Sequence, residues 1–449
     1  MMFAEFSEKS YRDELEALFL RFPSVQNVPF GDAYKPGLER MLEFDRLLGN
    51  PSRSCRVIHV AGTNGKGSVS NMLASCLSRH GYRTGLYTSP HINDFRERMR
   101  IAGPEGVASM VPREYVYDFI CRYKADFERL SLSFFEITTG MAFKWFADSD
   151  ADWIVLEVGL GGRLDSTNIV TPEISVITSI GLDHCDLLGH SLAEIASEKA
   201  GIIKPGVPVV IGEDHPGTRP VFEAKAASCA SGIIFAGSGH PTLEPRFPHI
   251  LSEMDLRGDY QAYNLRTAAS VLDLLGLSDP ISEDALIHTA SHMDFHGRWE
   301  RLRTRPTVLC DIGHNAHALR HNFAQLRRFA SAPDCSGLHI VYAIMADKDL
   351  DAILPLMPAE AIWHFATPSS RRSLPAEKIR ERYAQYLSSQ GLEAQGLYAY
   401  ADVASAVDAA LSQAGPDGII YIGGSTFAVS EAIPLFIPET DGSGTESRL

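Results

Sequence analysis

The stretch Gly62-Thr63-Asn64-Gly65-Lys66-Gly67-Ser68 follows a β-branched run and precedes a run with helical spacing. Glycines let the backbone curl so that its N–H groups point at phosphate oxygens, and a helix N-terminus adds positive potential there. Lys66 supplies a mobile cation. The usual loop has about four residues between its glycines and a hydroxyl directly after the lysine, whereas here two residues separate Gly62 from Gly65 and Gly67 precedes Ser68. The segment predicts a variant phosphate-binding loop; a glycine-rich turn without a ligand is the alternative.

Outward from this loop, short β-branched runs alternate with helical patterns, which predicts an α/β protein with parallel sheets. A chain of 449 residues is too long for one ordinary core, so we expect two domains. A mostly parallel, P-loop-type sheet is expected in residues 1–295, a smaller Rossmann-like α/β domain in 296–439 and a disordered tail in 440–449. The expected strands are Arg56–Ala61, Arg83–Thr88, Trp153–Val158, Ile174–Thr178, Val207–Ile211, Thr307–Asp311, Leu338–Ile344, Ile362–Ala366 and Gly418–Ile422. We also expect a helix over Tyr260–Leu275 and a surface loop between Ile101 and Val111.

Composition limits the class of protein. The formal charge is 41 − 56 = −15, which argues against a broad nucleic-acid surface. The N-terminus lacks a signal-peptide pattern and no apolar run is long enough to cross a bilayer. None of the seven cysteines is spaced as a zinc or redox pair, so they are expected to be reduced core residues of a cytoplasmic protein.

Three polar residues follow or end expected strands. Glu157 ends an apolar strand, and a carboxylate at the carboxyl end of a parallel strand faces the ligand crevice. Together with Ser89 and His184, Glu157 could hold one cation, although magnesium prefers oxygen ligands over a histidine. An ion-paired or helix-capping role for Glu157 and a hydrogen-bonded turn role for His184 stay open.

The loop GTNGKGS resembles that of the Mur ligase superfamily and, more narrowly, of the folylpolyglutamate synthase/dihydrofolate synthase family. Similar blocks follow in the family's order, and together they cover nearly the whole chain from Gly37 onward. They are SPH at 89–91, FFEIT at 134–138, EVGLGGRLDSTN at 157–168, ITSIGLDH at 177–184, EKAGIIKPG at 198–206, the segment around Asn264, GRWE at 297–300, DIGHNAHA at 311–318 and AIMADKD at 343–349.

The resemblance implies an ATP- and magnesium-dependent ligase that joins L-glutamate to dihydropteroate or to the glutamate tail of tetrahydrofolate through an acyl phosphate. It also implies a monomer. The implied magnesium ligands are Ser89, Glu157 and His184, with a second ion held by carbamylated Lys199. The implied catalytic residues are Lys66, His184 and Lys199. The implied ATP contacts are the loop Gly62, Thr63, Asn64, Gly65, Lys66, Gly67 and Ser68, with Asn264, Arg298 and Asp311. The implied pterin or folate pocket is Phe135, Glu136, Leu164, Asp165 and Ser166.

Plainer interpretations remain beside several of these assignments. Lys199 also fits a surface lysine near a helix C-terminus, where its charge suits the helix dipole. Arg298 and Asp311 also fit an interdomain ion pair. Some dual-function members of the family have an acidic residue where this chain has Lys35, which bears on pterin recognition.

Three other functions share some of these features. A cell-wall ligase that adds amino acids to a UDP-sugar peptide shares the loop, but it carries a further domain ahead of the loop, for which the 61 residues before Gly62 are too few. A phosphate-loop kinase or switch protein leaves the second α/β domain unexplained. A nucleotide-binding scaffold would bind ATP without glutamate-dependent turnover.

Overall fold

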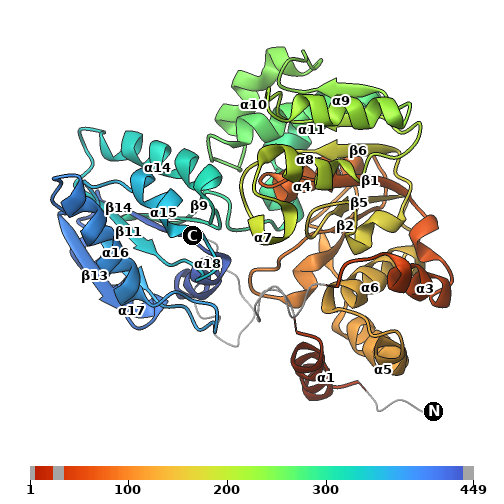
Figure 1. Ribbon diagram of the computed structural model, residues 1–449, viewed down its shortest axis with the longest axis horizontal. Helices are drawn as coiled ribbons and strands as arrows, with labels where there is room; N and C mark the ends of the chain where they lie inside the picture. The colour runs from red at the N-terminus through yellow and green to blue at the C-terminus, as the bar shows by residue number, and fades with distance from the viewer. Residues whose placement is uncertain (1–5, 24–34, 438–449) are drawn as a thin grey trace. The chain divides into compact units, whose positions relative to one another are not determined.

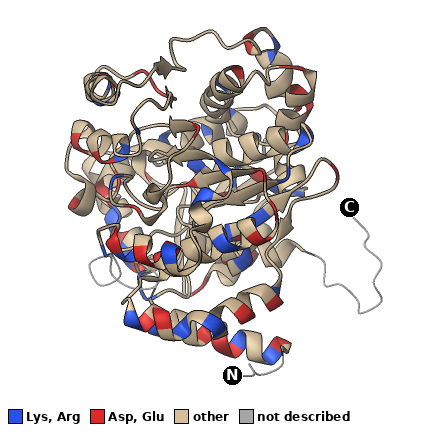
Figure 2. Ribbon diagram, turned by 90° about the vertical axis from the view of Figure 1, so that its right-hand side faces the viewer, with Lys and Arg blue, Asp and Glu red and all other residues tan. Residues whose placement is uncertain are grey.

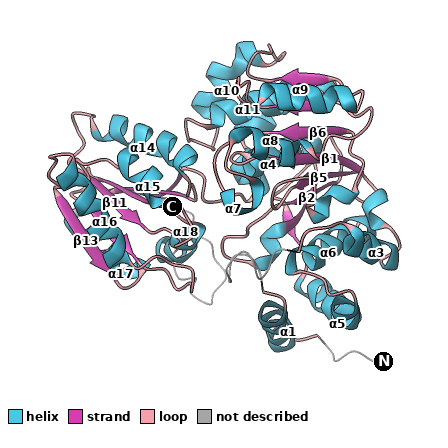
Figure 3. Cartoon of the chain, in the orientation of Figure 1, coloured by secondary structure: helices cyan, strands magenta, loops and turns pink. Residues whose placement is uncertain are grey.

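The computed structural model describes residues 6–23 and 35–437. The chain divides into two compact units, Met1–His296 and Gly297–Leu449, each with its own sheet and covering helices (Figures 1 and 3). The expected tail at 440–449 lies outside the described residues. No helix among those described is both long and apolar enough to cross a bilayer.

The sheet of the first unit has the strand order β4-β3-β2-β5-β1-β6-β7-β8. Its strands are β1 Arg56–Ala61, β2 Thr84–Tyr87, β3 Met99–Ala102, β4 Ser109–Met110, β5 Trp153–Glu157, β6 Ile174–Ile177, β7 Val209–Ile211 and β8 Ile233–Phe235. Neighbouring strands of this sheet are parallel, except for the pairs β2–β3 and β3–β4 at one edge, which are antiparallel. Strands β5 and β6 are buried along their whole length, as expected for parallel strands with helices on both faces.

Helices cover both faces of this sheet. They are α1 Glu8–Arg21, α3 Glu39–Leu47, α4 Lys66–Arg79, α5 Arg113–Arg129, α6 Phe134–Asp148, α7 Cys185–Leu188, α8 Leu192–Ala200, α9 Arg219–Ser228, α10 Phe247–Glu253, α11 Gln261–Leu275, α12 Pro280–Ile287 and α13 Thr289–Met293. On one face Ile58 and Val155 pack with α4, α11 and α12. On the other, their neighbours Val57 and Ile154 pack with α3, α5 and α6. Because successive side chains of a strand point to opposite faces of the sheet, each strand contributes to two separate cores.

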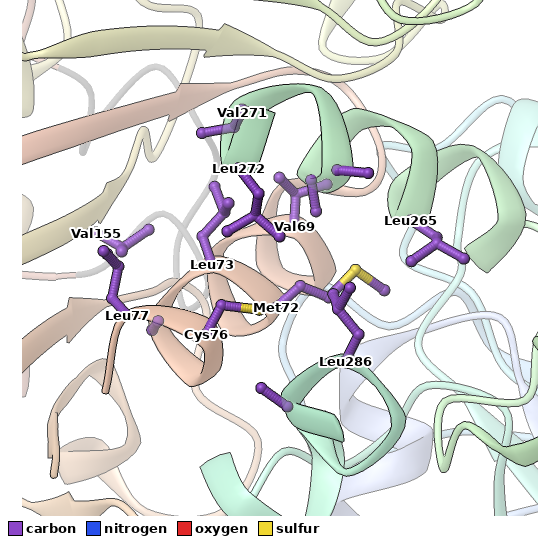
Figure 4. Close-up of a cluster of buried hydrophobic side chains, with 14 of the residues drawn as sticks. Val69, Met72, Leu73, Cys76, Leu77, Val155, Leu265, Val271, Leu272 and Leu286 are labelled. Carbon is purple, nitrogen blue, oxygen red and sulfur yellow. The ribbon is translucent and has the colours of Figure 1, made fainter. Parts of the chain in front are cut away.

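Helix α4 is anchored along its length, which fixes the phosphate loop at its start. Val69, Met72, Leu73, Cys76 and Leu77 are fully buried and face α11, α12 and Val155 of β5 (Figure 4). Their spacing of three and four residues places them on one side of the helix.

The outer helices carry charges of both signs. Figure 2 shows Lys, Arg, Asp and Glu interspersed along α1, the helix beside the N-terminus. Glu8 pairs with Arg113 at 2.8 Å and Glu14 with Lys124 at 2.9 Å, both in α5. Ion pairs of opposite charge therefore join α1 to α5.

The second unit holds a sheet with the order β13-β12-β11-β14-β10-β9, parallel except for β9. Its strands are β9 Glu300–Thr304, β10 Thr307–Asp311, β11 Leu338–Tyr342, β12 Ile362–Ala366, β13 Gly396–Tyr400 and β14 Ile419–Gly423. Its helices are α14 Ala316–Ala330, α15 Leu350–Ile353, α16 Ala376–Ser389, α17 Val403–Gln413 and α18 Thr426–Ala432.

The predicted fold class is confirmed: both units are α/β with mostly parallel sheets. Three strands have the predicted bounds, Arg56–Ala61, Thr307–Asp311 and Ile362–Ala366. The surface loop predicted between Ile101 and Val111 is wrong in part, because β3 extends to Ala102 and Ser109–Met110 form β4. A two-residue edge strand is too short to produce a pattern of alternating side chains.

Candidate active site

Four loops leave neighbouring parallel strands at one edge of the first sheet. The strands lie in the order β2-β5-β1-β6, and their carboxyl ends are in register, with Val60 opposite Glu157 and Ala61 opposite Ile177. The phosphate loop follows β1, the Gly159–Asn168 loop follows β5, Ser89 follows β2 and His184 follows β6. This is the edge at which parallel α/β sheets bind ligands.

The phosphate loop is held by the segment that follows β6. The Thr63 N–H donates to the Ser179 carbonyl at 2.7 Å, and the Thr178 hydroxyl donates to the Asn64 carbonyl at 2.7 Å. Gly62 has a φ of +150°, and a Cβ there would lie 1.8 Å from Thr178 Oγ1. The loop therefore needs glycine at this position, both for its backbone and for the close approach of Thr178.

Two lysines converge on one carbonyl of this loop. Lys66 Nζ donates to the Gly62 oxygen at 3.1 Å and to the Thr63 oxygen at 3.3 Å, while Lys199 Nζ donates to the Gly62 oxygen at 2.8 Å. Lys199 is buried, and burial, followed by the nearby charge of Lys66, lowers the pKa of Lys199 to about 7. Lys199 is therefore a buried amine, and a fraction of it is uncharged near neutral pH.

Ser89 and Glu157 lie together. The Ser89 N–H donates to Glu157 Oε2 at 3.2 Å, and Glu157 is buried. Buried Arg98 lies close enough that the charge of Glu157 opposes the lowering of the Arg98 pKa by burial. A hydroxyl and a carboxylate are oxygen donors of the kind that magnesium binds.

His184 immediately precedes α7 and has a left-handed φ of 52°. Among the described residues, no group of three or more His, Cys, Asp or Glu side chains is arranged to hold a metal by itself. A magnesium ion bound at this edge would also take ligands from nucleotide phosphates and water, as is common for this ion.

Phe135 and Gly159 form the start of the wall predicted to face a pterin. Half-buried Phe135 lies at the start of α6, and a Cβ on Gly159 would lie 2.4 Å from its ring. Ser166 Oγ is 3.3 Å from Thr139 Oγ1 of the same helix, and Leu164 is half-buried. The loop after β5 thus packs directly against α6.

The two acids of this wall have structural partners. Asp165 is buried and accepts the N–H groups of Leu160 at 2.8 Å and Thr167 at 3.0 Å. Burial raises the pKa of Asp165, and these hydrogen bonds oppose that effect. Glu136 accepts from Arg40 Nε at 3.1 Å and from the Ser133 N–H at 2.7 Å. Glu136 therefore fixes the start of α6, and its predicted contact with substrate stays a prediction.

The residues predicted to hold the rest of ATP lie on both units. Asn264 Nδ2 donates to Gln261 Oε1 at 2.7 Å, and Gln261 Nε2 donates to Ser68 Oγ at 3.3 Å, so α11 is tied to the start of α4. In the second unit, Asp311 accepts the Trp299 N–H at 2.9 Å and the Gly313 N–H at 2.7 Å. The nucleotide contacts of Asn264, Arg298 and Asp311 stay predictions.

Several residues of this edge were not singled out from the sequence. Thr178 and Ser179 stand inside the block ITSIGLDH, for which the family resemblance implies a role only for His184. Gln261 precedes Asn264 by three residues, one helical turn, which is the signal that could have identified it.

Comparison with known proteins places both units in described families. Residues 60–272 match the Mur ligase middle domain, and residues 297–426 match the Mur ligase, glutamate ligase domain. The dihydrofolate synthase/folylpolyglutamate synthase of Bacillus subtilis is 32% identical, over 88% of this chain and 94% of that protein.

Solved structures agree with this likeness. Escherichia coli FolC in complex with DHPP and ADP has a TM-score of 0.77 at 26% identity, covering 95% of this chain and 97% of that one. The bifunctional folylpolyglutamate synthase/dihydrofolate synthase of Yersinia pestis, complexed with AMPPNP and a Mn ion, has a TM-score of 0.76 at 26% identity, with the same coverage of 95% and 97%.

Proposed function

The chain belongs to the Mur ligase family, in its dihydrofolate synthase/folylpolyglutamate synthase branch, and from this premise we propose that it joins L-glutamate to a pterin acid. The acid is dihydropteroate, the glutamate tail of a tetrahydrofolate, or each in turn. The enzyme is an ATP-dependent amide ligase that also uses a divalent metal ion. We propose further that it acts as a monomer in the cytoplasm.

One observation carries this proposal: the phosphate loop and the Gly159–Asn168 loop leave neighbouring parallel strands, β1 and β5, at the same edge. A triphosphate on the first loop and a carboxylate beside the second would therefore meet above Val60 and Glu157. Phosphoryl transfer needs this approach, because it depends mainly on positioning and charge stabilisation.

The chemistry follows from the poor leaving group of a carboxylate. Its oxygen attacks the γ-phosphorus of ATP and ADP leaves, giving an acyl phosphate. The amino group of glutamate then attacks the acyl carbon, phosphate departs, and an amide remains. The Lys66 ammonium and the loop N–H groups stabilise charge on the transferred phosphoryl group.

We assign Ser89, Glu157 and His184 to a magnesium ion, which would neutralise phosphate charge when bound. Lys199 is assigned as a carbamate. Its neutral amine would add carbon dioxide and release a proton, and the resulting carboxylate-like group would hold a second ion. Support comes from the burial of Lys199 and its lowered pKa. Faster turnover after bicarbonate is returned to depleted enzyme would support the carbamate.

The test is a ligation assay with ATP, magnesium and labelled glutamate, in which dihydropteroate and tetrahydrofolate are offered separately. We expect ADP release that depends on both glutamate and a pterin acid. ATP binding without glutamate-dependent turnover on either acid would contradict the proposal.

A further inference from the structure

A buried chain of polar groups runs from the centre of the first sheet to Asp165. His59 Nε2 of β1 lies 2.8 Å from Thr167 Oγ1, and Thr167 Oγ1 lies 2.5 Å from Asp165 Oδ1. His59 and Thr167 have no exposed surface, and Asp165 retains 4%. Thr167 belongs to the short helix η3, Ser166–Ile169, which Asp165 caps.

The direction of these hydrogen bonds is determined by Asp165. It accepts backbone N–H groups at both oxygens, which favours its ionised form. The single proton of the Thr167 hydroxyl then goes to Asp165, so the hydroxyl oxygen accepts from His59. His59 must therefore carry its proton on Nε2. Burial lowers the pKa of His59 to about 3, so the ring stays neutral.

Packing alone does not explain an imidazole at this position. His59 lies in β1, with Leu156 of β5 and Ser175 of β6 on either side. Its Nδ1 is buried and has no hydrogen-bond partner among the described residues. A buried, unpaired polar atom costs free energy that a valine or isoleucine would not. The imidazole offsets this cost through its hydrogen bond to Thr167.

We propose that His59 and Thr167 are positioning residues that hold Asp165 as an ionised, oriented acceptor for N–H groups of the pterin ring. Two of the hydrogen bonds end at Asp165 Oδ1 and one at Oδ2, and the Gly159 N–H also lowers the pKa of Asp165, against the effect of burial. The N–H groups of the pterin ring would approach Oδ2, which accepts the fewer of these hydrogen bonds. The inference rests on the proposed function, because it assigns Asp165 to the substrate.

Other titratable groups surround this chain. Lys199 and Tyr87 interact with Asp165 through their charges, and Lys204 does so with His59. A pH profile of activity therefore reports on the hydrogen bonds of His59, Thr167 and Asp165 only when a variant is compared with the wild type over the same pH range.

The kinetic test compares Thr167→Val with Thr167→Ser. Losing the hydroxyl should raise KM for the pterin acid about tenfold, the loss expected for one hydrogen bond to a charged group, and leave KM for ATP unchanged. It should also move the acid limb of kcat/KM to higher pH, because a lost donor raises the pKa of Asp165. Serine should rescue most of the loss.

Two further variants separate this effect from folding. Thr289→Val removes a buried hydroxyl that donates to Ala285 O and Leu286 O on α12 and should change neither KM nor the pH profile. His59→Gln, which keeps a donor, should retain more activity than His59→Val.

A second readout needs no substrate. Nitrogen NMR of the labelled histidines should show His59 as the neutral Nε2–H tautomer from about pH 5 to 8. An Nδ1–H tautomer, or an unchanged KM and pH profile in Thr167→Val of an active enzyme, would overturn this inference alone. A wild-type enzyme that ligates no pterin acid would overturn the proposed function, and the substrate role of Asp165 with it.

Discussion

The phosphate loop and the Gly159–Asn168 loop leave adjacent strands, yet they are stabilised in different ways. Thr178 and Ser179, from the segment after β6, fix the carbonyl of Asn64 in the phosphate loop. The Gly159–Asn168 loop is fixed by its own Asp165 and by the end of α8, where the Arg163 N–H donates to Glu198 O at 2.9 Å. The phosphate loop is therefore held by a segment 114 and 115 residues away, whereas the Gly159–Asn168 loop is held in part by a carboxylate of its own.

The largest effect is expected from removing the lysine of the phosphate loop. Lys66→Ala should lower kcat by about 10³-fold or more, because it removes a charge that stabilises the transferred phosphoryl group. Lys225→Ala, on α9, is the matched control. Circular dichroism should show both variants folded, and near-normal turnover of Lys66→Ala would exclude its assigned role.

Two alanine substitutions should show that the two loops bind different substrates. Gly62→Ala places a Cβ 1.8 Å from Thr178 Oγ1, and Gly159→Ala places one 2.4 Å from the Phe135 ring. We expect the first to raise KM for ATP and the second KM for the pterin acid, each by up to about 10²-fold, because small displacements of a bound group are costly.

Gly103→Ala is the control for this pair, since a Cβ there meets nothing within 4 Å. Steady-state kinetics with each substrate varied in turn measures the separation. Equal effects of both variants on both KM values would show that the two loops act as one unit.

Lys199 touches the phosphate loop from α8, and its substitution should raise stability. The folded pKa of about 7 lies below that of an ordinary lysine, so between these two values the unfolded chain binds the extra proton and wild-type stability rises with pH. Lys199→Met lacks this penalty. Without bicarbonate it should be more stable than wild type by roughly a few kcal/mol at pH 6.

This stability gain should shrink as the pH rises from 7 towards 10. Calorimetry at pH 6 and pH 9 measures it, with Lys225→Met as the control. A gain that stays the same at both pH values would mean that Lys199 is not held in a lowered-pKa state.

The smallest effects are expected from removing side-chain hydrogen bonds that hold each loop. Ser179→Ala removes a hydrogen bond of 3.2 Å to Asn64 O. Asn168→Ala removes two, of 3.0 Å to Arg163 O and 3.1 Å to Gly201 O. The first should cost about 1 kcal/mol of folding free energy and the second about 1–2 kcal/mol. Ser179→Ala should raise KM for ATP several-fold and Asn168→Ala KM for the pterin acid. If Ser179→Ala raised KM for the pterin acid and Asn168→Ala raised KM for ATP in the same assay, the two loops could not be assigned to these substrates.

The two loops also differ in how much of each could be predicted from the sequence. The strand Arg56–Ala61, the glycines and Lys66 are contiguous, so their order alone predicted the loop and the helix after it. Family resemblance supplied Phe135 and Asp165 as pterin residues. The link from Asp165 through Thr167 to His59, which lies 108 positions from Thr167, follows from strand order in the sheet, which periodicity does not encode.

The sequence also did not predict the short edge strand or the partners of hydrogen bonds between distant residues. The two-residue strand β4 leaves no alternating pattern. Glu136 was assigned to substrate, but its ion pair with Arg40 spans 96 positions of sequence, and no local pattern identifies such a partner.

The central claim is that the acid beside the Gly159–Asn168 loop attacks a triphosphate held by the phosphate loop. Dihydropteroate labelled with oxygen-18 in its carboxylate tests this directly, by mass spectrometry of the phosphate released during ligation. We predict one labelled oxygen in each phosphate formed. Phosphate without label, released while the glutamate amide accumulates, would contradict the account.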